Sequence, residues 1–173
     1  MSSSIALLLL PTSNAVTVTT INREVFDGGE YKGRTDNVAP SAGMLGEQIR
    51  TYTSSSSPVA LTTATVTNIA SIALTAGIWD ISCVLYFQNS GAGTTCTEFR
   101  TAISTSSTTN TGGFGDATIL NAVPSAIYTD WCMSIPQYRV ELASSQTYYL
   151  NARAVFAINT MQAFGRISAV RVA

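Results

Sequence analysis

Histidine is absent from this chain of 173 residues, and cysteine occurs only three times. Without histidine, the Ser-His-Asp and Cys-His arrangements of nucleophilic catalysis and most catalytic zinc sites are excluded. Cys83, Cys96 and Cys132 show no C-x-x-C spacing, so the sequence predicts neither a disulfide framework nor a zinc site. We expect these residues to be buried free thiols, and we expect no cofactor.

Charge is also scarce. Charged residues make up 11% of the chain, compared with roughly 25% in an average soluble protein. The 9 basic and 10 acidic residues are scattered singly and give a net charge of -1. Because no basic stripe is available to neutralise phosphates, nucleic acid is not an expected partner. A surface with so little charge suits packing against other protein copies.

Long hydrophobic runs are missing as well. The run "IALLLL" covers only residues 5–10, has no Lys or Arg before it and ends at Pro11. A membrane span needs roughly 20 apolar residues, and a signal peptide needs a basic start and a small-x-small cleavage site. We therefore expect no membrane association, no signal peptide and synthesis in the cytosol.

The residues that are abundant favour strands and turns. Thr, Val and Ile favour strands, whereas Ser, Gly and Asn favour turns. Short alternating segments recur between Ser, Gly, Asn and Pro clusters, and no helical period competes. We expect strands near residues 46–53, 58–67, 69–75, 78–88, 95–104, 117–122, 136–143, 147–158 and 163–172. The sequence therefore predicts an all-β fold, an antiparallel two-sheet sandwich that is jelly-roll-like.

The stretch "IWDISCVLYFQ" illustrates how the strands should face. Alternate residues form a uniformly apolar inner face: Trp79, Ile81, Cys83, Leu85 and Phe87. Segments 148–158 and 138–142 repeat this pattern. The outer faces are only partly polar, because Val84, Tyr86, Tyr149 and Val155 would lie there. Since a monomer would expose these four side chains, they are the predicted subunit-interface residues.

The first 42 residues differ in composition from the rest. They carry much of the charge and contain turn signals such as "DGG" and "NVAPSAG", although "AVTVTTI" at 15–21 predicts one strand. We interpret residues 1–42 as an extended N-terminal attachment arm and residues 43–173 as the β-sandwich domain. The predicted contact residues of the arm with a partner protein are Ile5, Leu7, Leu8, Leu9, Leu10, Arg23, Phe26, Tyr31 and Arg34.

A pair of carboxylates is the one common catalytic arrangement that the composition leaves open. Asp80, Asp116 and Asp130 could in principle supply the acid and nucleophile of a glycosidase. None of them lies in a local motif, and single aspartates more often cap turns or pair with arginine. Trp131 and Tyr128 could stack on a sugar, but core aromatics are the commoner case. We therefore predict that the protein is not an enzyme.

Three segments carry a resemblance to a known family. The G-x-x-G-E segment at Gly43–Glu47, the L-T-A-G-x-W-D segment at Leu74–Asp80 and the closing "FGRISAVRV" resemble a β-sandwich domain of tailed-phage virion proteins. The resemblance covers about residues 41–173. It implies a domain found at tail-fibre ends and on the capsid exterior, generally as a trimer without enzymatic activity. Physically, Gly77 would form the tight turn before the core strand, Trp79 would fill the sandwich, and Asp80 could accept hydrogen bonds from the backbone of the turn.

These observations lead to two hypotheses about the role. The first is a homotrimeric capsid decoration (cement) protein, made in the host cytoplasm and placed on the virion exterior, which bridges subunits of the major capsid protein. The second is a tail-fibre or tail-tip protein whose sandwich binds the host receptor. The expected partners are further copies of the chain and the major capsid protein or another virion protein, with a host-surface saccharide as an additional candidate. A coiled-coil or repetitive shaft, which a fibre tip requires, is not evident in the first 43 residues.

Overall fold

The computed structural model describes residues 38–89, 94–110, 117–120, 130–157 and 159–173. The chain divides into two units, Met1–Asn37 and Val38–Ala173. The predicted arm residues and the strand predicted at 15–21 lie outside the described residues. Val38–Ala42, assigned to the arm from the sequence, are grouped with the second unit.

The described part of the chain is built from antiparallel strands. Their bounds are β1 (Gln48–Thr53), β2 (Val59–Leu61), β3 (Thr67–Leu74), β4 (Gly77–Asn89), β5 (Thr95–Ser104), β6 (Ala117–Leu120), β7 (Asp130–Leu142), β8 (Gln146–Ala157) and β9 (Met161–Arg171). The described ranges contain no helix with the length and apolar character needed to cross a membrane. The all-β prediction is confirmed.

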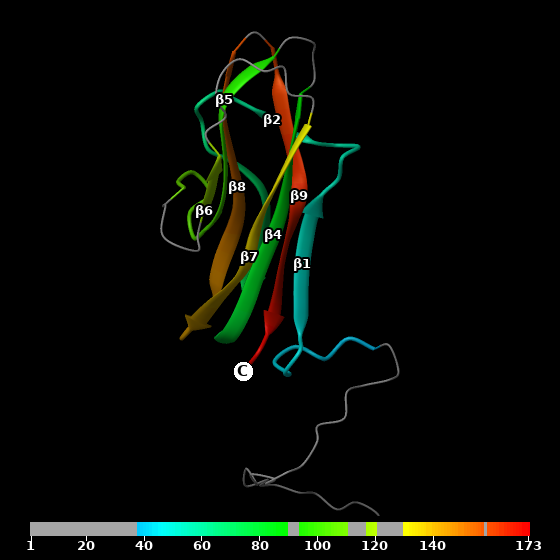
Figure 1. Cartoon of the computed structure of the whole chain (residues 1–173). Helices are drawn as coiled ribbons and strands as arrows, with labels where there is room; N and C mark the ends of the chain where they lie inside the picture. Colours follow the sequence, from blue (N-terminus) through cyan, green and yellow to red (C-terminus); the bar gives the residue numbers. More distant parts are fainter. Residues whose placement is uncertain (1–37, 90–93, 111–116, 121–129, 158) are drawn as a thin grey trace, which may run out of the picture. The chain divides into compact units, whose positions relative to one another are not determined.

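The strands form two sheets with jelly-roll connectivity. One sheet has the order β1-β9-β4-β7, with β2 paired to β9, and the other has the order β3-β8-β5-β6. Chain-consecutive strands mostly lie in different sheets or at non-adjacent positions, as the two Greek keys of a jelly roll require. Figure 1 shows β1, β9, β4 and β7 side by side, with the C-terminus at the end where β1 begins. The jelly-roll-like prediction is confirmed.

Two strand predictions are wrong in extent. The strand predicted over 58–67 ends at Leu61, because a turn follows in which the Thr65 amide donates to the Thr62 carbonyl at 3.1 Å. β7 begins at Asp130, not near Pro136. Proline is tolerated inside it because β7 is an edge strand. The register also shifts where Pro136 and Gln137 stand opposite Ser82.

The core lies between the sheets and follows the predicted alternation. On β4, Trp79, Ile81 and Leu85 have no exposed surface, and Cys83 and Phe87 are also buried. On β8, Leu150, Ala152 and Ala154 face the same core. The inner faces predicted for these strands are therefore confirmed, with Ile158 outside the described residues.

The cysteines agree with the prediction in two cases. Cys83 and Cys96 are free and buried, and burial raises the pKa of each thiol to about 11. Cys132 is free but exposed, so the prediction that it is buried is wrong. The reason is its place on the outer face of β7, directly opposite Tyr86 of β4.

Gly165 marks a close approach between β9 and β4. A Cβ atom added at this position would collide with the Val84 carbonyl oxygen and would lie 3.0 Å from the Leu85 Cα. Both of these are backbone atoms, which cannot move aside as a flexible side chain can. The absence of a side chain therefore allows the two central strands to pair here.

We predict that Gly165→Ala lowers the free energy of unfolding by about 1–3 kcal/mol, the usual range for overpacking a well-packed site. Urea denaturation of the purified protein measures this change. The control is Thr51→Ala at an exposed position of the neighbouring strand β1, which should change stability by less than about 0.5 kcal/mol. Equal stability of Gly165→Ala and the original protein would contradict the close approach.

Candidate functional site

An ion pair at one end of the sandwich joins the first strand to the last. The Glu47 carboxylate accepts hydrogen bonds from the Arg171 Nε at 2.9 Å and from the Gly43 amide at 2.7 Å. Both charged residues are buried, with exposed fractions of 8% for Glu47 and 6% for Arg171. The pKa of Glu47 is held below its ordinary value mainly by the Gly43 amide, with Arg171 adding to the effect against the cost of burial. The Glu47 carboxylate is therefore ionised at neutral pH.

Arg171 also holds the turn before β4. Its guanidinium donates to the Ala76 carbonyl at 2.8 Å and to the Thr75 hydroxyl at 2.6 Å. The guanidinium carbon lies 4.3 Å from the centroid of the Trp79 ring, within the range of a cation–π contact. The Trp79 indole in turn donates to the Thr75 carbonyl at 2.9 Å. The Gly43–Glu47 and Leu74–Asp80 segments therefore meet at the side chain of Arg171, which lies in the closing segment of the same resemblance.

Gly77 is required by this arrangement. Its φ of +137° is strained for any residue with a side chain, and an added Cβ would collide with the Arg171 guanidinium. The expectation that Gly77 forms the turn and that Trp79 fills the sandwich agrees with the structure.

Asp80 does not bind the turn, so that expectation is wrong. Its carboxylate accepts two hydrogen bonds from Arg139, at 2.8 and 2.9 Å, and a third from Gln137. The cause is strand alternation, which points Asp80 outward to its ladder partner Arg139 on β7. The hydrogen bonds from Arg139 are the main reason that the pKa of Asp80 is lowered.

The candidate catalytic carboxylates are not brought together. Asp80 pairs with Arg139 in the ladder, whereas Asp130 pairs with Gln88 at the other end of β4. From residue 80 to residue 88, the strand rises by roughly 26 Å. The carboxyl groups of a glycosidase pair are about 5 to 9.5 Å apart. Asp80 and Asp130 therefore cannot form one, and Asp116 lies outside the described residues.

Two further observations concern ligands. In the part of the chain that the structure describes, no three His, Cys, Asp or Glu side chains gather closely enough to hold a metal ion. Trp131 packs against the core, and its ring stacks on Phe99 with centroids 6.1 Å apart. The core interpretation of Trp131 is therefore the one that the structure supports, and Tyr128 lies outside the described residues.

The four predicted interface residues fall on opposite sides of the sandwich. Val84 and Tyr86 lie on the outer face of the β1-β9-β4-β7 sheet, and Tyr149 and Val155 lie on the outer face of β3-β8-β5-β6. Tyr86 is exposed, and the other three are half-buried. One flat interface cannot contain both pairs.

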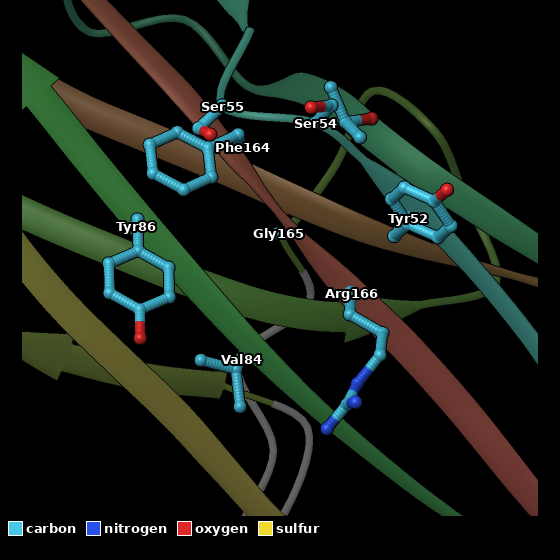
Figure 2. A pocket seen from close by; sticks show the side chains of 9 residues that line it. Tyr52, Ser54, Ser55, Val84, Tyr86, Phe164, Gly165 and Arg166 are labelled. Carbon is cyan, nitrogen blue, oxygen red and sulfur yellow. The ribbon is translucent and has the colours of Figure 1, made fainter.

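The Tyr86 side of the molecule has an open groove. The Tyr86 and Phe164 rings are stacked, with centroids 5.1 Å apart and an interplanar angle of 5°. Figure 2 shows them side by side on β4 and β9, with Tyr52 on the far side of β9 and Arg166 extending past Val84. The groove has a volume of about 420 Å³ and is lined by Tyr52, Thr53, Ser54, Ser55, Val84, Tyr86, Phe164, Gly165 and Arg166. A hydrogen bond with the neighbouring Cys132 is the main cause of a raised pKa at Tyr86.

The other exposed apolar group lies where the chain enters the sandwich. Val38, Met44 and Leu45 are 55%, 60% and 71% exposed. Backbone hydrogen bonds hold the turn that carries Met44 and Leu45, because the Met44 amide donates to the Ser41 carbonyl and the Gly46 amide donates to the Arg171 carbonyl at 2.9 Å. We call Val38, Met44 and Leu45 the apolar tip.

The groove residues Tyr52, Phe164 and Arg166 were not identified from the sequence. A sequence signal for two of them was present in "MQAFGRISAV", where Phe164 and Arg166 alternate with inward residues and so lie on the outer face of β9. Tyr52 lacked such a signal, because its face depends on pairing with Arg166 across the sheet.

No protein-family model and no curated protein sequence matches the chain. Among solved structures, the chain is similar in fold to one from "Structure of infectious bursal disease virus Gx strain", with 11% identity and a TM-score of 0.44. The match covers 82% of this chain and 36% of that chain, so this chain spans about a third of the length of its neighbour. A similarity at this level carries no argument about function.

We predict that Glu47→Gln lowers the free energy of unfolding at pH 7 by about 3 kcal/mol, because it leaves the buried Arg171 charge unpaired. Urea denaturation measures this change.

The dependence of the free energy of unfolding on pH should change as well. Since the folded pKa of Glu47 is lowered from 4.5, its contribution is present above that value and is lost as pH falls through the folded pKa. Urea midpoints between pH 7 and pH 3 should therefore fall less steeply in Glu47→Gln. Gln48→Ala, at an exposed position, serves as the control. If the urea midpoint of Glu47→Gln falls with pH as steeply as that of the original protein, the prediction is contradicted.

Proposed function

We propose that the protein is a non-enzymatic structural component of a virion, and specifically a trimeric decoration protein on the exterior of the head. The observation that carries this proposal is the apolar tip at the end where the chain enters a jelly-roll body. Jelly rolls are a recurrent architecture of viral capsid domains, although they also occur in lectins and cupins. An exposed apolar end that follows a separate N-terminal unit in the chain suits attachment to an underlying protein surface.

The proposed mechanism is mechanical. The arm and the apolar tip together would bury apolar surface on the major capsid protein, at about 25 cal/mol for each Å² removed from water. A trimer would repeat these contacts at each subunit and so bridge neighbouring shell subunits. Low charge would make the attachment only weakly dependent on salt.

The absence of catalysis is part of the same proposal. It is supported by the roles of the described carboxylates, since Asp80 is bound by Arg139 and Gln137, and Glu47 is bound by Arg171. Groups held in this way are occupied by structural contacts.

The second candidate is a tail-fibre or tail-tip protein that binds a host receptor. The groove favours it, because aromatic rings, hydroxyl groups and an arginine side chain are suited to a host-surface saccharide. The decoration proposal places attachment at the arm and tip, whereas the receptor proposal places it at the groove. One binding experiment can therefore separate them.

We predict that purified full-length protein co-sediments with virion shells that lack it. Deletion of residues 1–37, and the substitution Leu8→Asp/Leu9→Asp, should each reduce the bound fraction at least tenfold, because the apolar contacts of the arm are lost. The control Thr105→Asp/Thr109→Asp places the same two negative charges on exposed loop residues and should bind normally. If the full-length protein does not co-sediment with the shells but adsorbs to host cells, the tail-fibre alternative replaces the decoration proposal.

A further inference from the structure

We infer that the outer face of the β1-β9-β4-β7 sheet is the surface on which a second copy of this chain packs, and that the opposite face is not. The inference deepens the self-association in the proposed function but needs no shell or host partner. It can therefore fail or succeed independently of the virion role.

The first argument is the apolar character of this face. Tyr86 is 41% exposed, Tyr52 is 70% exposed and Val170 is 36% exposed. Tyr86 lies opposite Phe164 in the ladder between β4 and β9. The exposed aromatic surface therefore continues from one central strand to the next, and a partner copy would remove it from water.

The second argument is the distribution of charge. Arg50 and Arg166 are exposed on β1 and β9, and no ion pair between described residues involves either of them. On the β7 side, Asp80 and Glu141 flank a single cation, Arg139. One side of the face is therefore positive and the other is negative. Two copies can pair these sides with each other.

The third argument is size. Four strands spaced about 4.8 Å apart, with a mean length of about 36 Å because β1 is shorter than the other three, give a face of roughly 700 Å². A stable interface buries about 800 Å² on each partner. The face is thus close to the area that one neighbouring copy would need, and the groove of about 420 Å³ can take up side chains from that copy.

The opposite face is covered by the chain itself. Asn151 points outward from β8 but has no exposed surface, because its amide donates to the carbonyls of Ser106 at 2.8 Å and Thr109 at 3.2 Å. The loop that carries these carbonyls therefore lies over the sheet. Glu98 on this face is bound by Arg153 and lies 3.7 Å from Arg100. This face has paired charges and no exposed large apolar side chain among its described residues.

The two faces allow a matched test. Val84→Asp/Tyr86→Asp and Tyr149→Asp/Val155→Asp introduce the same substitutions on central strands of the two sheets. Full-length protein and both variants are compared by sedimentation equilibrium from 1 to 100 μM. Circular dichroism and thermal unfolding verify that each variant is folded.

We expect an oligomer for the original protein and for Tyr149→Asp/Val155→Asp, and a dissociation constant raised at least a hundredfold for Val84→Asp/Tyr86→Asp. If Val84→Asp/Tyr86→Asp is unfolded, the milder Phe164→Ser is used in its place, with the same expectation. An original protein that is monomeric at 100 μM overturns the inference, whether or not the groove then binds a saccharide. An oligomer that survives substitution of the Tyr86 face, or dissociates on substitution of the Tyr149 face, also overturns it. A dimer in place of a trimer would support this inference while contradicting the trimer in the proposed function.

Discussion

The buried pair between Glu47 and Arg171 is the interaction on which the described body depends. It joins residues 124 positions apart in the sequence, one just before β1 and one at the end of β9. Arg171 also donates hydrogen bonds to Ala76 and Thr75 in the turn before β4, and its guanidinium lies over the Trp79 ring. Because a buried charge without its partner is strongly destabilising, removal of either side chain would affect β1, β4 and β9 together.

The same pair also positions the exposed apolar side chains at this end of the sandwich. The Glu47 carboxylate accepts a hydrogen bond from the Gly43 amide, so the turn that carries Met44 and Leu45 is tied to the sandwich although both side chains are exposed. A preorganised apolar turn binds a partner at a lower entropic cost than a flexible one. The pair thus relates the stability of the fold to the proposed attachment end, while the sheet face that carries Tyr86 stays available for another copy.

Local patterns in the sequence predicted most of the fold. Alternation placed Trp79, Leu85 and Leu150 inside because the side-chain period of a strand is two, whatever its partners. Alternation also placed Tyr86 outside, yet it could not show that Tyr149 faces the opposite side of the molecule. That separation depends on which sheet each strand joins, which is a property of the topology and not of the strand.

Pairing across the sheet explains the other differences. Asp80 was expected to bind its own turn, but its ladder partner is Arg139, which is 59 residues away. The strand was predicted to begin near residue 136, but an edge position with a register shift accommodates Pro136 within β7. Glu47 and Arg171 both lie in segments that carry the resemblance, but their pairing was not predicted, since their contact depends on segments 124 residues apart in the chain.

A double-mutant cycle on Glu47 and Arg171 tests this account most directly. Glu47→Gln, Arg171→Met and the double variant would be compared with the original protein by urea denaturation at pH 7. The account predicts that the double variant is more stable than the sum of the single changes implies, with a coupling free energy of at least about 1 kcal/mol. Additive changes, equal within about 0.5 kcal/mol, would show that the two side chains act independently and would contradict the account.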